Sequence, residues 1–592
     1  MNAFQAWLDR DLRRSLLLAL LALAALSALV LFQQLGGLGL MDKTEGLFVE
    51  VPRQMLLSGD WITPRWNGDT FFDYPVWGYW MVGLSFRLFG ISEWAARLPA
   101  ALAAAATAYG LFALLFLVAP PEEAPHRRIG RATLGATVLL LSPGWVGWGR
   151  SSVTDMFLAS GISLALLGFG LAHGRSDRPQ LQKLGYSLLA LFCGVAVLAK
   201  GPVGVLLPGL VIIGFLLLKG SLLAQLRRTP WLPMLALFFG VVAPWYSLAT
   251  AANGPTFLAR FLGFSNLERF TSVLYDHPGP PWFYLPWLLL LLLPWSLYLP
   301  LAMARLRFWR LDAWRRSSAP ADLSLLALLW LVLMVAFFSA AATKLPGYIL
   351  PALPGAVLLV TLLFVPFEGA STGTATGTAT AVRGLRWSGG LNALLLALMA
   401  VAAVLTPRWL EQDPSYPGFA TALAGSGVPW LAGLPLLLAA LALLALLLRP
   451  QAPALQWLWL PNAAGFAALL ALVVPVLVPL MDRERQLPIR ELARLAAAQA
   501  RPDEPLLVAG YKRYSVVFYS GRPVLFVSSP RRARRQLAQQ GFSDRAGSVL
   551  LLGNDSELLE FGLGPSDGIL IERRDAHRLV RLPLQQLQQL GR

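Results

Sequence analysis

The sequence predicts a polytopic α-helical membrane protein that ends in a small C-terminal α/β soluble domain. Of the 592 residues, 56% are hydrophobic and only 14% are charged, and the mean hydropathy is +0.59. Soluble domains carry about 25% charged residues. Residues 482–592 hold 30 of the charged residues, whereas the first 481 residues hold the other 51. We therefore expect a membrane domain at 1–481 and an extracytoplasmic α/β domain at 482–592.

The membrane domain is expected to contain about 13 transmembrane helices. A helix that crosses the hydrocarbon core needs about 20 apolar residues. The first run reads as a retained span, because no small-residue cleavage site follows it. The expected spans are 15–32, 96–118, 132–149, 154–173, 184–200, 202–219, 231–250, 283–303, 323–341, 346–364, 389–406, 429–448 and 458–480.

The loops between these spans predict the orientation of the chain. Cytoplasmic loops are rich in Lys and Arg. With the N-terminus inside, every inner loop is basic, beginning with Arg127, Arg128 and Arg131. An odd number of spans then places the C-terminal domain outside, together with long loops at about 33–95 and 251–282. The net charge of +17 therefore largely reflects topology, and nucleic-acid binding is not expected.

Residues 366–382 are of low complexity and are interpreted as a flexible linker on the inner side. The C-terminal domain alternates between short apolar runs and polar segments. Its helix at 531–540 carries four arginines (531, 532, 534 and 535), interpreted as a solvated face, with contact to anionic lipid or glycan as the alternative. A helix is also expected at 490–499, and strands are expected at 506–511, 515–520, 523–528, 548–553, 568–573 and 579–582.

Some classes of site are excluded by composition. The single cysteine, Cys193, rules out a disulfide framework or a thiolate metal cluster. The four histidines are too scattered to suggest a histidine-based metal site. Neither a Walker-type nor a Gly-rich dinucleotide motif occurs.

The few charged residues near the ends of spans are the functional candidates, because charge in a membrane segment is costly. On the expected topology all of them reach the outer interface. Separate anchors and snorkelling side chains are the simpler interpretation, but that does not explain why carboxylates and cations gather on one side. The candidates are Asp42, Glu45, Asp73, Asp155, Lys200, Arg269, His277 and Lys344.

Such a set suggests group transfer from a lipid phosphate. Lys200, Lys344 and Arg269 would neutralise the phosphate as point charges. Carboxylates would accept a proton from an acceptor hydroxyl or coordinate a cation. If a divalent metal is used, its ligands would come from Asp42, Glu45 and Asp155.

Several motifs, in order and spacing, resemble a known family. The sequence is similar to the GT-C glycosyltransferases of the protein-mannosyltransferase superfamily, and in particular to the bacterial lipid A aminoarabinose transferases and related family-39- and family-83-type enzymes. The resemblance is dense over residues 42–351. Its main stretches are 55–65 (Met-Leu-Leu-Ser-Gly-Asp-Trp-Ile-Thr-Pro-Arg), 72–80, 88–98, Asp155, 198–201 (Leu-Ala-Lys-Gly), 244–246, 266–284 and 338–351, which includes Lys344-Leu-Pro-Gly-Tyr348.

The resemblance implies a hexosyl- or pentosyltransferase (EC 2.4 class) that inverts the sugar carbon. The donor would be a polyprenyl-phosphate sugar and the acceptor lipid A, another glycolipid or a protein. Binding of these substrates would involve Tyr74, Tyr348 and His277. The resemblance also implies a multi-pass protein of the bacterial inner membrane, with a cytoplasmic N-terminus and a periplasmic C-terminal domain.

Two departures from the family affect the site. The family's catalytic aspartate in the first outer loop aligns with Thr44, so the base could be Glu45 or Asp42, helped by Asp155 and Asp73. The aminoarabinose branch has Glu-Lys-Pro where this chain has Asp73-Tyr74-Pro75, which puts aminoarabinose and lipid A specificity in doubt.

A flippase for lipid-linked sugars is the alternative from another class, because it would use the same phosphate-binding cations. It would also need charges deep in the spans, and these spans carry almost none. A membrane scaffold whose tail binds glycans gives no reason for the positions of Lys200 and Lys344.

Overall fold

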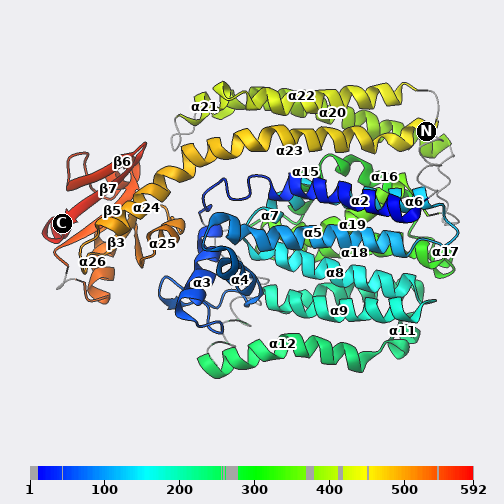
Figure 1. Ribbon diagram of the computed structural model, residues 1–592, viewed down its shortest axis with the longest axis horizontal. Helices are drawn as coiled ribbons and strands as arrows, with labels where there is room; N and C mark the ends of the chain where they lie inside the picture. Colours follow the sequence, from blue (N-terminus) through cyan, green and yellow to red (C-terminus); the bar gives the residue numbers. More distant parts are fainter. Residues whose placement is uncertain are drawn as a thin grey trace.

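The computed structural model describes residues 11–42, 44–254, 257, 261, 278–367, 379–410, 418–449, 452–542 and 546–590. The chain is a multi-pass bundle of apolar helices with a β-sheet domain at one end (Figure 1). Within the described residues, ten helices are long and apolar enough to span a membrane. They are Leu12–Phe32 (α2 with η1), Glu93–Leu117 (α5), Thr154–Gly174 (α8), Pro179–Lys200 (α9), Trp231–Asn253 (α12), Pro320–Ala340 (α18), Pro346–Phe364 (η4 with α19), Val382–Leu410 (α20), Val428–Leu447 (α22) and Ala454–Gln499 (η5, α23, η6 and α24).

The remaining expected spans are shorter or broken. Residues 284–305 form two helices bent by 112°, α15 (Tyr284–Leu291) and the run Trp295–Arg305 (η3 and α16), which would make an eleventh span. The run expected at 202–219 is the 17-residue helix α10 (Val203–Lys219). The run expected at 132–149 is divided at Pro143, which cannot donate a backbone hydrogen bond, into α6 (Pro125–Leu140) and α7 (Pro143–Gly149). The count of about 13 therefore stays a prediction.

The region expected as the first long loop contains helices that are too short to span. They are α3 (Glu45–Ser58) and α4 (Trp77–Phe89), separated by a hairpin of β1 (Arg65–Trp66) and β2 (Asp69–Thr70). Helix α3 ends at Gly59, whose φ of 74° suits glycine. Both helices lie between the bundle and the sheet domain (Figure 1). We call this the domain end of the bundle.

The C-terminal domain contains a five-stranded sheet in the order β4-β3-β5-β7-β6. The central strand β5 is parallel to β3 and antiparallel to β7. The strands are β3 (Leu506–Ala509), β4 (Val524–Val527), β5 (Ser548–Asn554), β6 (Ile569–Arg574) and β7 (His577–Pro583). The helices are α24 (Leu487–Gln499), α25 (Ser515–Ser520), α26 (Pro530–Gln539), α27 (Asp555–Glu560) and α28 (Leu584–Gln589).

The strand expected at 515–520 was wrong, because these residues form α25. The run Val-Val-Phe-Tyr has strong β propensity, but burial of Val516, Val517 and Tyr519 against α24 and α3 outweighs it. Gly521, with φ of 63°, ends the helix.

The sheet domain is packed firmly on the helical part. Helix α23 (Trp459–Met481) continues through the π-helix η6 (Asp482–Gln486) into α24, so the boundary predicted at 481/482 falls inside continuous helix. A single hydrophobic cluster also joins Leu40, Val49 and Phe86 to Leu492 and Val516 of the domain. The position of the domain relative to the bundle is therefore set by apolar burial as well as by the chain connection.

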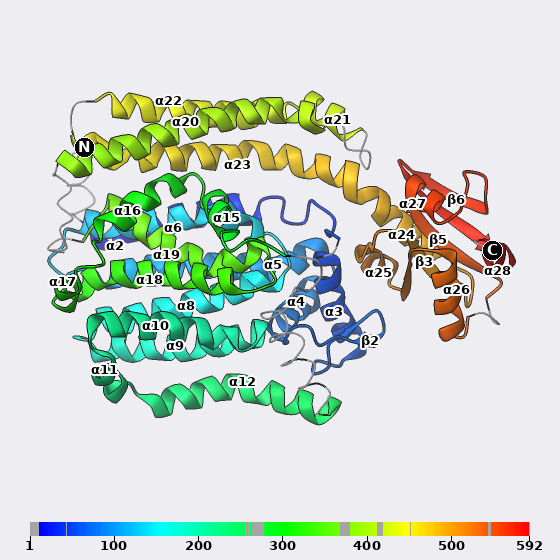
Figure 2. The ribbon, with the colours of Figure 1, turned by 180° about the vertical axis from the view of Figure 1, so that it is seen from behind.

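The basic loops lie at the opposite end of the bundle. The labels of α11 (Leu222–Arg228) and α17 (Leu311–Arg315) mark that end of the bundle (Figures 1 and 2). Helices α20 and α22 form an outer layer beside α23, and α21 (Phe419–Gly425) caps them at the domain end (Figure 2). The linker expected at 366–382 falls mostly outside the described residues; its last residues, 379–382, begin the helix α20 (Ala379–Leu410).

Candidate functional site

Lys200 and Asp155 form an ion pair at the domain end of two neighbouring helices. Asp155 lies in the first turn of α8, and Lys200 is the last residue of α9. A carboxylate is favoured at a helix N-terminus and an ammonium at a C-terminus. Gly201 follows with φ of 89°, a conformation that favours glycine and turns the chain sharply towards α10.

Two tyrosine rings flank the Lys200 ammonium. Its Nζ atom lies 4.8 Å from the ring centroid of Tyr348 and 5.6 Å from that of Tyr74. These are cation–π distances. Phe48 packs on Tyr74 at 5.0 Å between centroids, and Phe338 packs on Tyr348 at 5.8 Å, so both rings are held in place. Four residues singled out from the sequence, Asp155, Lys200, Tyr74 and Tyr348, therefore form one group, which we call the lysine cluster.

Tyr348 reaches this cluster from a tight turn. It lies in the 3₁₀-helix η4 (Pro346–Ala352), directly after Gly347. A Cβ at Gly347 would approach the Trp148 indole Nε1 to 2.6 Å, so only glycine allows this turn to pack against α7. The Lys-Leu-Pro-Gly-Tyr motif thus forms a tight turn that places the ring of Tyr348 beside Lys200.

The other predicted phosphate-binding residues have different outcomes. Lys344 is buried before η4, its ammonium donates to the carbonyl of Ala341, and its side chain packs against Gly279. Arg269 and His277 lie outside the described residues, and their assignment stays a prediction.

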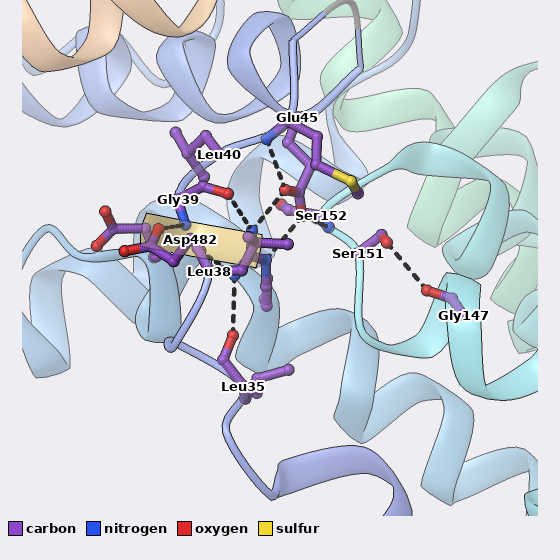
Figure 3. Close-up of polar contacts among 12 residues, drawn as sticks. Leu35, Leu38, Gly39, Leu40, Glu45, Gly147, Ser151, Ser152 and Asp482 are labelled. Atoms are coloured by element: carbon purple, nitrogen blue, oxygen red, sulfur yellow. Dashed lines mark hydrogen bonds and ion pairs between the residues drawn. The ribbon is translucent and has the colours of Figure 1, made fainter. Parts of the chain in front are cut away.

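Glu45 and Arg97 form a separate buried ion pair (Figure 3). The Arg97 Nε and Nη2 donate to the two carboxylate oxygens at 2.8 and 2.7 Å. The carboxylate also accepts from the backbone N–H groups of Ser152 at 2.9 Å and Met41 at 3.1 Å. Burial alone would raise the pKa of Glu45, but the Arg97 charge and these hydrogen bonds lower it. A carboxylate with four donors is well suited to holding structure in place.

Arg97 uses its remaining N–H groups on the chain before Glu45. It donates to the backbone carbonyls of Leu35 at 3.0 Å, Leu38 at 2.6 Å and Gly39 at 3.0 Å (Figure 3). The first part of the long loop is thereby fastened to α5. The sequence matched Arg97 to a motif without giving it a role; the signal was an arginine inside the first turns of an apolar span.

Two more predicted carboxylates face the sheet domain. Asp42 accepts a hydrogen bond from the backbone N–H of Ser515 at 2.9 Å. Burial raises the pKa of Asp42, and the bond from Ser515 only partly offsets this effect. Asp73 is half-buried just before Tyr74. The pKa of Tyr514 in the domain is raised by burial and then by the negative charge of Asp73, so Asp73 lies near enough to the domain to act on Tyr514.

The predicted metal ligands do not form one site. Asp155 is paired with Lys200, Glu45 with Arg97, and Asp42 is hydrogen-bonded to Ser515. Among the residues that the structure describes, no group of three or more His, Cys, Asp or Glu side chains could hold a metal ion. Each of these three carboxylates has a different partner, and their assignment as metal ligands stays a prediction.

A polar network that the sequence did not indicate joins the long loop to the sheet domain. The Asp482 carboxylate accepts from the N–H of Gly39 at 2.7 Å and from Arg490 at 2.7 Å. The hydroxyl of Tyr519 accepts from the N–H of Leu40 at 2.8 Å and donates to Glu93 at 2.9 Å. Apart from Asp482 and Arg490, these partners lie more than 400 positions apart, so no local pattern reveals them.

Known proteins share this architecture. Residues 73–247 match the family model described as dolichyl-phosphate-mannose-protein mannosyltransferase. Residues 499–592 match the C-terminal domain of cyanobacterial RgtA-type glycosyltransferases. The structure resembles ArnT from Cupriavidus metallidurans bound to undecaprenyl phosphate, with a TM-score of 0.71 and 22% identity over 95% of this chain and 97% of that one. It also resembles the archaeal oligosaccharyltransferase AglB from Archaeoglobus fulgidus, with a TM-score of 0.50 and 10% identity over 93% of this chain and 70% of that one. At these identities the likeness shows the fold.

Curated relatives are similar over part of the chain. An undecaprenyl phosphate-alpha-4-amino-4-deoxy-L-arabinose arabinosyl transferase from Shewanella sediminis is 31% identical over 62% of this chain and 62% of its own length. One from Pseudomonas aeruginosa is 33% identical over 62% of this chain and 61% of its own length. The match thus spans less than two thirds of these relatives. The fold is that of a multi-pass membrane protein of the GT-C architecture.

Proposed function

We propose that the protein transfers a monosaccharide from a polyprenyl-phosphate donor to an acceptor hydroxyl at the domain end of the bundle. The observation that carries this proposal is the lysine cluster. A mostly buried ammonium, held between two tyrosine rings at the end of two spans, is placed to bind a phosphate that enters from the membrane surface. The relatives named for undecaprenyl-phosphate aminoarabinose, and the ArnT structure with undecaprenyl phosphate, support a donor of this class.

Donor binding would exchange one anion for another. In the structure Lys200 is neutralised by Asp155, and the phosphate would replace that carboxylate as its partner. Lys344 and Arg269 would supply further positive charge to the same phosphate. Tyr74 and Tyr348 would help hold Lys200 in position for the phosphate, because both rings lie within cation–π distance of the ammonium.

The reaction is an inverting displacement. The acceptor oxygen forms a bond to the anomeric carbon, the bond from that carbon to the phosphate oxygen breaks, and the acceptor proton passes to a carboxylate. We propose Asp73 as that base, because it directly precedes Tyr74 of the lysine cluster in the sequence and its charge acts on Tyr514 of the sheet domain. Asp42 is the other candidate.

Glu45 would act as a positioning residue. Its carboxylate receives four hydrogen bonds, which lower its pKa and make it a weak proton acceptor. The family's catalytic aspartate aligns with Thr44, which cannot act as a carboxylate base. A base at Asp73 or Asp42 is therefore consistent with this difference between the chain and the family.

We further propose that the domain end faces the periplasm and that the protein resides in a bacterial inner membrane. The basic loops collect at the opposite end of the bundle, as expected for the cytoplasmic side. The predicted division into a membrane domain at 1–481 and a periplasmic domain at 482–592 belongs to this proposal.

A transfer assay tests the function. Purified full-length protein in detergent would be incubated with radiolabelled undecaprenyl-phosphate monosaccharides and a bacterial glycolipid extract. We expect a labelled product, and a loss of rate of about 100-fold or more in Lys200→Gln and in Asp73→Asn. Lys183→Gln, on the exposed opposite end of the same helix α9, is the matched control and should transfer at the wild-type rate.

Detergent also separates transfer from transport, since no compartment exists there. A complete absence of labelled product across the sugar panel would favour the flippase alternative. If product forms and both variants keep the wild-type rate, the site assignment is wrong while the activity stands.

A further inference from the structure

A cavity of about 370 Å³ lies between the first long loop, the outer end of the last span and the sheet domain. Its walls include Asp42 from the loop and Met481 from the end of α23. The sheet domain contributes Tyr511, Arg513 and Glu557. Lys200, Asp155, Tyr74 and Tyr348 do not line it, so it is distinct from the lysine cluster. A cavity of this volume is within the range of small-ligand sites.

The charges in this cavity balance. Arg513 is paired with Glu557 at 2.7 Å, and its Nη2 lies 3.3 Å from Nε2 of His577. Burial and the neighbouring Arg513 lower the pKa of His577 to about 4, so this imidazole is neutral at neutral pH. Asp42 and Arg485 contribute one further charge of each sign. A site with no net charge does not select for a phosphate or another anion.

The lining instead offers many directed hydrogen-bonding groups beside apolar surface. Carboxylate oxygens accept, guanidinium N–H groups donate, and the Asn554 amide nitrogen donates, while the Asn554 oxygen already accepts from the N–H of Glu557. Tyr511 is 44% exposed and presents a ring with an apolar face. A sugar ring matches this combination, because its hydroxyls both donate and accept while its C–H faces are apolar.

The cavity is also linked to the Glu45–Arg97 pair through the first long loop. Met41 lines it, while the backbone N–H of Met41 donates to Glu45 at 3.1 Å. Asp42 joins this same loop to Ser515 of the domain at 2.9 Å. A ligand in this cavity would contact the same loop, at Met41 and Asp42, that is hydrogen-bonded to Glu45 of the Glu45–Arg97 pair.

We propose that this cavity binds a neutral saccharide unit of the acceptor, so that the acceptor is a glycan-bearing molecule held by the C-terminal domain while its hydroxyl reaches the donor. This inference rests on the proposed function, which supplies the acceptor role. Binding itself does not depend on transfer and is measured without donor.

Saturation-transfer NMR on the full-length protein in nanodiscs tests the proposal, since nanodiscs avoid sugar-headed detergents. The probes are dephosphorylated core oligosaccharide from a bacterial lipopolysaccharide, the same material with its phosphates, and inorganic phosphate. We expect the dephosphorylated oligosaccharide to bind, and Tyr511→Ala to weaken its affinity about tenfold. Met481→Trp, which fills the cavity from the helical side, should weaken it as well. Ile569→Ala, an exposed apolar residue on β6, is the matched control.

The outcomes separate this proposal from the proposed function. No binding of the dephosphorylated probe, binding that survives both cavity variants, or binding only of phosphate-bearing probes would overturn the saccharide site. Lys200→Gln should keep saccharide binding while losing affinity for undecaprenyl phosphate. A protein that binds the saccharide but never transfers a sugar would disprove the proposed function alone.

Discussion

The carboxylate of Glu45 and the guanidinium of Arg97 form a two-point ion pair in which both side chains are almost fully buried, with 0% and 4% of their surface exposed. The pair connects the start of α3 to the first turns of α5 across 52 positions of sequence. Because Arg97 also binds three loop carbonyls, one side chain holds the loop that carries Asp42.

Replacing Arg97 with Met should strongly destabilise the protein. The substitution leaves the Glu45 carboxylate buried without its counter-charge, which costs about 3–5 kcal/mol. Thermal unfolding of the purified protein measures the loss. Arg65→Met is the matched control, because the Arg65 side chain is 45% exposed and its ion pair with Asp60 is long, at 4.0 Å. This substitution should change the free energy of unfolding by less than about 1 kcal/mol. Equal effects in the two variants would contradict a central role for Arg97.

Tyr348→Ala should weaken binding of undecaprenyl phosphate, whereas Tyr348→Phe should not. The ring 4.8 Å from Lys200 Nζ restrains the ammonium through its face, and phenylalanine keeps that face. A contact worth about 1 kcal/mol corresponds to roughly a fivefold change in dissociation constant. Isothermal titration with undecaprenyl phosphate measures it, and Tyr511→Ala is the control. If Phe is as damaging as Ala, the hydroxyl rather than the ring would be the important group.

Acid should destabilise the protein through His577. Burial, and then the charge of Arg513, lower its folded pKa to about 4, against 6.5 for the ordinary side chain. The unfolded state therefore binds the proton first, and stability falls as the pH drops from about 6.5 to about 4, by about 3 kcal/mol in total. His577→Gln should show a shallower loss of melting temperature between pH 6.5 and 4.5. Above pH 7.5 the imidazole is neutral in both states, so the two proteins should show the same pH slope there.

Asn67→Ala should loosen the edge of the sheet. The Asn67 side chain donates to the carbonyl of Val524 at 2.9 Å and accepts from its N–H at 2.8 Å, so it covers the free edge of β4. Loss of the two bonds costs about 1–3 kcal/mol. Hydrogen exchange at the N–H of Val524 should accelerate in this variant and stay unchanged in Asp69→Ala, a neighbouring hairpin substitution. Unaltered exchange in Asn67→Ala would show that packing alone protects this edge.

Much of the lysine cluster was visible in the sequence. Charges are expensive near membrane spans, so Lys200 and Asp155 stood out singly, and the motifs around Tyr74 and Tyr348 marked those residues. That these four side chains meet depends on α8 packing against α9, and on η4 placing its tyrosine at their end. The helix α25 was missed for a related reason, because its apolar run forms a strand or a helix according to what it packs on.

The sequence alone determined that the protein is a polytopic helical membrane protein, which apolar runs become spans, and which few charged residues are worth testing. These depend on transfer free energies and residue spacing, which are local properties. Tertiary structure alone decided the partners: Glu45 with Arg97, Asp42 with Ser515, and the cavity beneath Tyr511. Ser515 lies 473 positions from Asp42. Such contacts depend on how helices and sheet pack in space, and the pKa of each carboxylate follows from the partner it meets there.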